Sequence, residues 1–193
     1  IIGLVYGIDR RSLAGIIGAL AGSIVTCFMA LFFVSRFKIH GAVMSYSEML
    51  LYSGYENLNL TEIFIASIFI ASSGAVMDVA VDITSAVAEV VEKKPDITRA
   101  EAIKSGINVG RSIMGTMMTT LLLAYSGGYI GLLMVFMAQG TPIINILNLK
   151  YVSSEILHTL VGSFGLITVA PFTAIASGIL LAERNNENET QIN

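Results

Sequence analysis

Residues 63–82 read IFIASIFIASSGAVMDVAVD, an apolar run that carries two aspartates toward its end, Asp78 and Asp82. About 20 apolar residues are enough to cross the hydrocarbon core of a bilayer as a helix. An ionisable residue inside such a segment costs about 2.5–3.5 kcal/mol on insertion scales, so its presence indicates a functional role. Because the aspartates are four residues apart, both carboxylates lie on one face of the helix. The stretch predicts a transmembrane helix with a polar face.

The composition of the whole chain extends this prediction. Hydrophobic residues make up 54% of the sequence and charged residues only 13%, against about 25% charged residues in soluble domains. Three long stretches contain no charged residue at all: 13–35, 112–149 and 156–182. The short alternating segments that a transmembrane barrel requires are absent from the sequence. The predicted fold class is therefore all-α, a polytopic transmembrane helical bundle.

The apolar runs predict one transmembrane helical domain over residues 1–182. Its expected spans are about 1–8, 13–34, 61–91, 107–125 and 154–182. The chain does not begin with Met, so we expect residues 1–8 to be the truncated end of an earlier helix. Glycines and Pro142 interrupt residues 127–149, which predicts a re-entrant or interfacial segment, with an extra short span as the alternative. The polar residues 183–193 are expected to form a disordered tail.

Basic residues predict how the bundle is oriented, because cytoplasmic loops carry an excess of Lys and Arg. Eight of them fall on one side of the predicted spans: Arg10, Arg11, Lys93, Lys94, Arg99, Lys104, Arg111 and Arg184. Three fall on the other side: Arg36, Lys38 and Lys150. The larger group is expected to face the cytoplasm. The helix that follows this cytoplasmic linker begins with Thr98 and Glu101, which fit a capping box.

Hydroxyl groups on this following helix match the depth of Asp78. If Glu89 marks the cytoplasmic interface, Asp78 lies about 16 Å deeper at 1.5 Å per residue. Thr119 and Thr120 lie about 12–13 Å inside Arg111 by the same rise. The candidate proton- or ion-binding residues are Asp78, Asp82, Thr116, Thr119 and Thr120, with Asn108, Arg111 and Ser112 in support. Two antiparallel helices would thus set a carboxylate that binds and releases a proton against hydroxyl groups.

These residues favour a proton- or cation-coupled transporter or an export accessory, with Asp78 as the protonatable site and Asp82 as a relay. The alternative is a non-transporting scaffold or partner subunit, in which Asp78 is a hydrogen-bonded packing residue and small-residue faces such as Gly18 and Gly22 bind other helices. An intramembrane aspartyl protease is disfavoured because its two carboxylates share a proton from different helices. We expect no enzymatic activity, no cofactor and no metal site, since no cluster of His, Cys and carboxylates has metal-ligand spacing.

Two motifs carry a resemblance to a known family. Residues 74–80 read GAVMDVA and residues 105–117 read SGINVGRSIMGTM. With 121–125, they resemble the YibE/F family of bacterial membrane proteins. The resemblance reaches about residue 182 and implies a multi-pass protein of the bacterial inner (plasma) membrane. An N-terminal helix and an extracytoplasmic domain usually precede this region in the family. An acidic residue is common where this chain has Ser112, so any role of that acid is absent here or carried by Asp82.

A more distant likeness covers perhaps 60 residues. A Gly-x-x-x-Asp span followed by a Thr-rich span is similar to the transmembrane half of SecD/SecF and of resistance-nodulation-division proteins, where the matching acidic position contributes to proton-driven export. Only Asp78, Thr119 and Thr120 correspond to that pattern, which is an analogy at the level of fold. It implies that a half-size module pairs with a second copy or a paralogue. The expected partners are the lipid bilayer and that membrane partner, with no nucleic acid and an unknown substrate.

Overall fold

The structure is a computed structural model that describes residues 3, 7, 9–44, 47–55 and 57–190, with side chains described as far as residue 182. All regular structure in these residues is helical, which confirms the predicted all-α class. The elements are α2 (Arg10–Arg36), the short 3₁₀ helix η1 (Gly41–Val43), α3 (Ser47–Tyr52), α4 (Leu60–Lys93), α5 (Arg99–Ala138), α6 (Ile143–Asn148) and α7 (Lys150–Thr190). Four of these helices, α2, α4, α5 and α7, are long and apolar enough to cross a membrane. The predicted truncated span at residues 1–8 lies largely outside the described residues.

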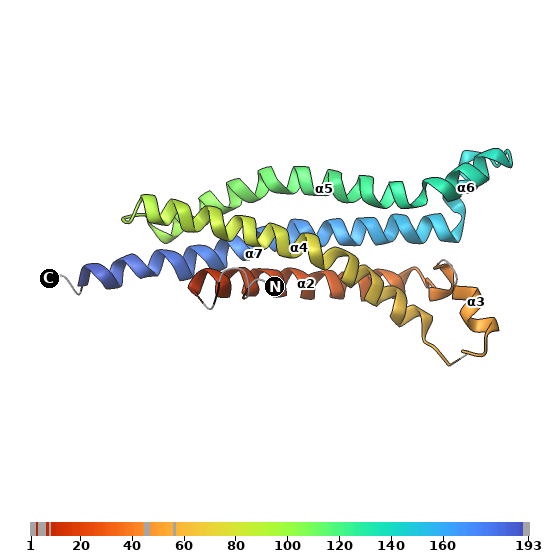
Figure 1. The fold of residues 1–193 in the computed structure, drawn as a ribbon, viewed down its shortest axis with the longest axis horizontal. Helices are drawn as coiled ribbons and strands as arrows, with labels where there is room; N and C mark the ends of the chain where they lie inside the picture. Colours follow the sequence, from red (N-terminus) through yellow and green to blue (C-terminus); the bar gives the residue numbers. More distant parts are fainter. Residues whose placement is uncertain (1–2, 4–6, 8, 45–46, 56, 191–193) are drawn as a thin grey trace.

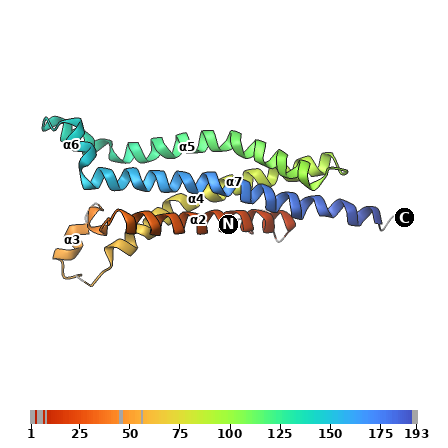
Figure 2. The same cartoon turned by 180° about the vertical axis from the view of Figure 1, so that it is seen from behind.

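The four long helices form an elongated bundle (Figures 1 and 2). Helix α7 is central and packs against α2, α4 and α5. The turn between α4 and α5 lies at one end of the bundle, and the short helices α3 and α6 lie at the other (Figure 1). An ion pair between Arg11 on α2 and Glu92 on α4, 3.2 Å from Nη2 to Oε2, joins the two helices at the first end. That end carries most of the basic residues that predict the cytoplasmic side.

Close packing between α2 and α7 depends on glycine. A Cβ on Gly18 would lie 2.7 Å from Cα of Thr173, and a Cβ on Gly22 would lie 2.7 Å from Cβ of Val169. Real side chains do not approach this closely, so only glycine allows the two helices to meet here. The small-residue face that the sequence offers for helix binding is therefore used within the chain.

Helix α5 begins as the sequence predicts. Thr98 is its N-cap, and Glu101 completes a capping box: the Glu101 N–H donates to Thr98 Oγ1 over 3.3 Å, and the Thr98 N–H donates to Glu101 Oε2 over 3.2 Å. Two N–H groups that have no partner inside the helix are satisfied by this reciprocal pair. The predicted capping box is confirmed.

The end of α5 differs from the prediction. The helix continues through 127–131 and stops at Ala138, where the sequence predicts a break after residue 125. Elongating an existing helix costs little, and isolated glycines do not end it. The helix ends instead just before Gly140, whose φ of +69° belongs to a left-handed C-terminal cap. Only residues 143–148 then form a separate short helix, α6.

The last helix also exceeds its predicted length. Helix α7 passes through Pro171 without a break and runs to Thr190. The sequence predicts a disordered tail from residue 183, so the structure corrects this expectation for the backbone of 183–190. Continuation of a helix that is already formed is again the physical reason. Residues 191–193 of the predicted tail lie outside the described residues.

The C-terminus of α2 is closed by a Schellman motif. The N–H of Ile39 donates to the Val34 carbonyl over 3.1 Å, and the N–H of Lys38 donates to the Ser35 carbonyl over 3.3 Å. The residue at the position of Lys38 in this motif adopts a left-handed backbone and is usually glycine. Lys38 has φ of +50° and is the only described non-glycine residue with positive φ. The left-handed region costs a residue with a Cβ about 1–2 kcal/mol.

Candidate functional site

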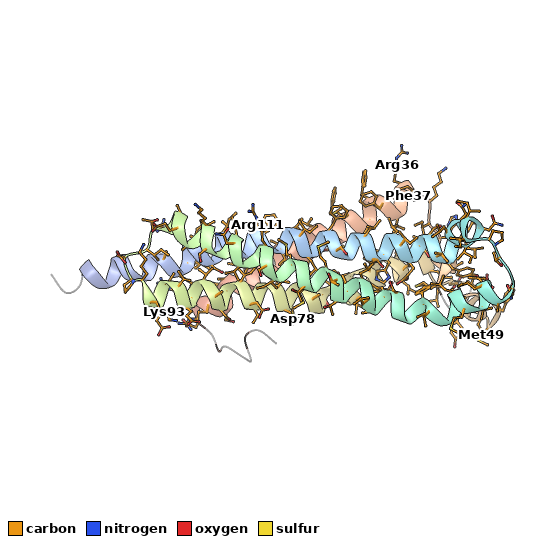
Figure 3. All side chains as sticks on the ribbon, turned by 90° about the horizontal axis from the view of Figure 1, so that it is seen from above. Arg36, Phe37, Met49, Asp78, Lys93 and Arg111 are labelled. Carbon is orange, nitrogen blue, oxygen red and sulfur yellow. The ribbon has the colours of Figure 1, made fainter. Side chains whose placement is uncertain are left out.

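The two aspartates lie on the outer face of α4. Asp78 is 15 residues before Lys93 and 18 after Leu60, which is about 22 Å and 27 Å at 1.5 Å per residue. It is therefore near the middle of the helix, with Asp82 one turn closer to Lys93. Both residues are exposed, and Asp78 points away from the bundle (Figure 3). Within the described part of the chain, neither carboxylate has a hydrogen-bond or ion-pair partner.

The predicted polar residues of α5 also point outward. Asn108, Arg111, Ser112, Thr116, Thr119 and Thr120 are all exposed. The hydroxyls of Thr119 and Thr120 donate to carbonyls of their own helix, to Gly115 over 3.0 Å and to Thr116 over 3.1 Å. In the view of Figure 3, Arg111 and Asp78 project from opposite edges of the bundle.

A different face of α5 packs against the rest of the chain. A Cβ on Gly106 would lie 2.9 Å from Val87 and Ala174, and a Cβ on Gly110 would lie 3.0 Å from Ile83. Helix α5 thus rests on α4 and α7 through glycines. The expectation that Asp78 meets the threonines inside one chain is not met, because these glycines allow the closer helix approach and turn the threonines outward.

An outward carboxylate has a consequence in a membrane. A charged group at the middle of the bilayer is costly against lipid and is found facing protein or water. Asp78 and Asp82 on α4, and the hydroxyl-rich face of α5, are all exposed when the chain is alone. Within the single chain these residues therefore do not form an enclosed site.

The motifs that surround these residues decide the family. A family model described as YibE/F-like protein matches residues 1–183. The chain belongs to the YibE/F family. Neither a curated protein nor a solved structure matches the chain. For this YibE/F protein, the match together with the four apolar helices establishes an integral membrane protein.

The YibE/F chain also holds a buried polar cluster that the sequence analysis does not identify. His158 on α7 is 9% exposed, and its Nδ1 lies 3.5 Å from Oε2 of Glu155. Tyr129 on α5 lies close to Glu155, and the ring centroids of Tyr125 and His158 are 4.9 Å apart. Nε2 of His158 and the hydroxyl of Tyr125 are buried without a partner in the described residues.

This cluster links α5 and α7 toward the end of the bundle away from Glu92. The signal that identifies it is spacing: Glu155 and His158 are three residues apart and Tyr125 and Tyr129 are four apart, so each pair shares a helix face. Glu155 lies at the start of an otherwise charge-free span and is only 17% exposed. The described residues contain no group of three or more His, Cys, Asp and Glu that could hold a metal ion.

Proposed function

We propose that this YibE/F protein is a proton- or cation-coupled transporter, or the coupling subunit of an export system, in the bacterial inner membrane. Asp78 is the residue that binds and releases the ion. The observation that carries the proposal is the position of this carboxylate, near the middle of a membrane-length helix and exposed on its outer face. Retaining such a residue at membrane depth is costly unless it is used.

A second copy of the chain, or a paralogue, completes the site. In the most apolar stretch of α5, no residue is buried inside the chain. In the corresponding stretch of α7, half of the residues are buried. Its exposed side carries Ser112, Thr116 and Thr119, whose hydroxyls suit contacts between membrane helices. A partner that also covers the outer face of α4 removes the carboxylates of Asp78 and Asp82 from lipid and encloses a polar path.

Acidic residues mark the cytoplasmic part of this path. Asp82 and Glu89 follow Asp78 on the same side of α4, and all three are exposed. Glu89 accepts a hydrogen bond from Lys93 over 2.6 Å at the cytoplasmic end. Asp82, between them, relays the ion from Glu89 to Asp78, because successive turns place the carboxylates along one helix face.

Infrared difference spectroscopy across pH tests the proposal on protein reconstituted in membranes. The wild type is expected to show a carboxyl band that changes with pH and disappears in Asp78→Asn. Glu62→Gln is the control, because it removes an exposed carboxylate in the first turn of the same helix, outside the proposed path. A carboxyl group of Asp78 that stays protonated at every accessible pH contradicts ion coupling.

A scaffold role is the second candidate, and the exposed glycines favour it. A Cβ on Gly74 or Gly115 meets nothing within 4 Å, so both positions are open for another helix to approach. A scaffold needs this surface but not the charge of Asp78. The scaffold role is supported if Asp78→Asn keeps full function while Gly115→Leu loses function.

A further inference from the structure

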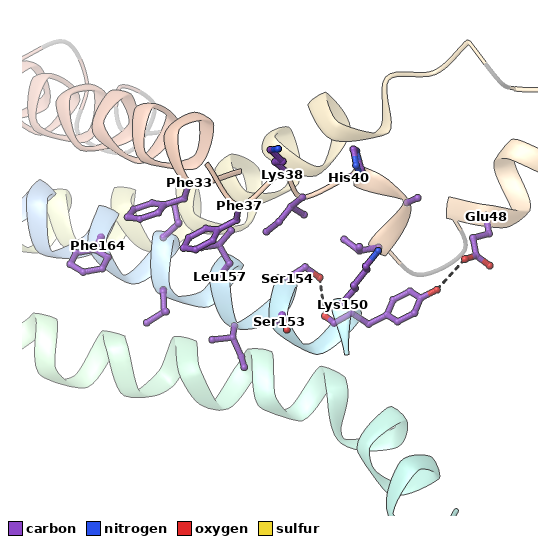
Figure 4. Close-up of a pocket in the computed structure, with 17 residues that line it drawn as sticks. Phe33, Phe37, Lys38, His40, Glu48, Lys150, Ser153, Ser154, Leu157 and Phe164 are labelled. Carbon is purple, nitrogen blue, oxygen red and sulfur yellow. Dashed lines mark hydrogen bonds between the residues drawn. The ribbon is translucent and has the colours of Figure 1, made fainter. Parts of the chain in front are cut away.

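A cavity of about 750 Å³ opens at the end of the bundle opposite the Arg11–Glu92 pair. It lies between the end of α2, η1, α3 and about the first four turns of α7 (Figure 4). Its volume is in the range of pockets that hold small molecules, about 300–1,000 Å³. None of the candidate ion-binding residues lines it.

The walls of the cavity are apolar along most of its length. Phe33 and Phe37, at the end of α2, line it together with Leu157, Leu160 and Phe164 of α7. Phe37 is 61% exposed, Leu160 51% and Phe164 45%, so this part of the cavity opens to the side of the bundle. In a membrane this side meets lipid chains, which enter an apolar groove without losing any favourable contact with water.

Basic side chains lie at the other end of the cavity, away from the apolar walls. Figure 4 shows Lys38, His40 and Lys150 there, away from Phe33 and Phe164. The one carboxylate in the lining, Glu48, accepts a hydrogen bond from the hydroxyl of Tyr151 over 3.2 Å. Among the described residues, neither Lys38 nor Lys150 has an ion-pair partner. With two lysines and one carboxylate in the lining, this end of the cavity, its mouth, has an excess of positive charge.

The position of Lys38 adds an independent observation. It occupies the left-handed position of the Schellman motif that closes α2, where glycine avoids the steric penalty. The chain thus holds a cation at the mouth of the cavity in a backbone conformation that disfavours lysine. Residues in such conformations concentrate at ligand-binding sites.

We propose that this cavity binds one membrane phospholipid with an anionic headgroup. An acyl chain lies between Phe33, Leu157 and Phe164, and the phosphate group is held by Lys38 and Lys150. The assignment depends on the order of the groups along the cavity, because an apolar slot open to the bilayer leads to two lysines at the ends of α2 and α7. Basic pockets between membrane helices bind phospholipid headgroups through the same chemistry. The lipid comes from the leaflet opposite the predicted cytoplasmic side.

Native mass spectrometry of the whole chain, released from bilayers of equal phosphatidylglycerol and phosphatidylcholine with identical acyl chains, tests this site. The wild type is expected to retain one phosphatidylglycerol. The double variant Lys38→Gln/Lys150→Gln is expected to lose this retention by about tenfold or more, the effect of losing charge-assisted hydrogen bonds. Lys104→Gln, which removes a positive charge from exposed α5 near the other end, is the matched control and keeps the lipid.

Two further variants separate binding from folding. Lys38→Gly removes the cation and relieves the left-handed backbone, so weaker lipid retention in this variant does not arise from loss of the fold. Leu160→Trp narrows the apolar slot and is expected to lower retention while leaving both lysines in place. Equal retention of the two lipids by the wild type, or unchanged phosphatidylglycerol retention in the double variant, overturns the proposal. Competition by glycerol phosphate as strong as that by the intact lipid also overturns it, because the apolar slot then adds nothing.

Discussion

Asp78 and Asp82 lie one helical turn apart near the middle of α4, and both side chains point out of the bundle. The helix that follows in the chain, α5, does not cover them, because it packs on α4 and α7 through Gly106 and Gly110. A YibE/F chain on its own therefore presents carboxylates at membrane depth. The proposed function and the proposed partner both follow from this arrangement.

Replacing Asp78 by Asn separates function from folding. Since Asp78 is exposed and has no partner in the described residues, the free energy of unfolding in detergent is expected to change by no more than about 0.5 kcal/mol. Ion-coupled activity in reconstituted membranes is expected to be lost. Thermal unfolding followed by a thiol-reactive dye at Cys27, together with proton flux, measures both effects. A large loss of stability in this variant means that the aspartate is a packing residue instead.

Two glycines on different surfaces are expected to respond differently to a methyl group. Gly18→Ala places a Cβ against the backbone of Thr173 and is expected to destabilise the chain by about 1–3 kcal/mol through overpacking. Gly115→Ala meets nothing within 4 Å and is expected to stabilise it by up to about 1 kcal/mol through helix propensity. Melting temperatures of the two variants check this, and equal effects contradict the packing of α2 on α7.

A larger residue at Gly115 tests the outer surface itself. Gly115→Leu is expected to leave the melting temperature of the single chain unchanged or to raise it slightly through helix propensity. It is expected to weaken association between copies, because the position is open within the chain. Sedimentation in a density-matched detergent reads the oligomeric state. An oligomer that survives this change places the partner on a different face.

Lys38→Gly is expected to stabilise the chain by about 1 kcal/mol. The Schellman motif holds Lys38 at φ of +50°, and glycine adopts this region without a steric penalty. The melting temperature measures the gain. Lys38→Gln is the control, because it removes the charge but keeps the Cβ, and it is expected to give no such gain. An equal gain in melting temperature in both variants would show that the loss of charge, and not the backbone conformation, causes the effect.

The capping box of α5 is expected to depend on pH. The pKa of Glu101 is lowered from its ordinary value of 4.5. The largest causes are hydrogen bonds from the backbone and the side chain of Thr98, and the positive charge of Lys94 adds a smaller effect. A carboxyl group with a lowered pKa in the folded state stabilises that state above 4.5, and the contribution is lost as the pH falls through the lowered value. Hydrogen exchange at residues 99–102 is expected to speed up in acid, and Glu101→Gln is expected to remove this dependence.

Sequence patterns were sufficient to predict the helices but not their faces. Long apolar runs predict the four long spans, and Thr98 with Glu101 predicts the start of α5, because these features depend on local chemistry. The direction of a helix face depends on what surrounds it. In a membrane the outside is as apolar as the inside, so hydrophobic periodicity does not distinguish them. Thr26 and Thr173 are buried, whereas Thr116 and Thr119 are exposed.

The same physical reason explains the sites that the sequence does not reveal. Glu155 and His158 lie near the start of a long apolar run, where polar residues ordinarily mark the membrane interface. Only the packing of α5 on α7 brings Tyr125 and Tyr129 to them. The cavity beside Lys38 and Lys150 likewise joins segments that are more than 100 residues apart.

The central claim is that the outward polar surface of α4 and α5 meets protein or water in the membrane. A nitroxide label at Thr119, in a chain with Cys27→Ala, measures this directly through its collisions with oxygen and with a water-soluble nickel complex. The label at exposed, apolar Ile24 on α2 provides the lipid-facing reference. Our account predicts low oxygen accessibility at Thr119, or accessibility to the nickel complex. Oxygen accessibility equal to that at Ile24 would place Thr119 against lipid and contradict the account.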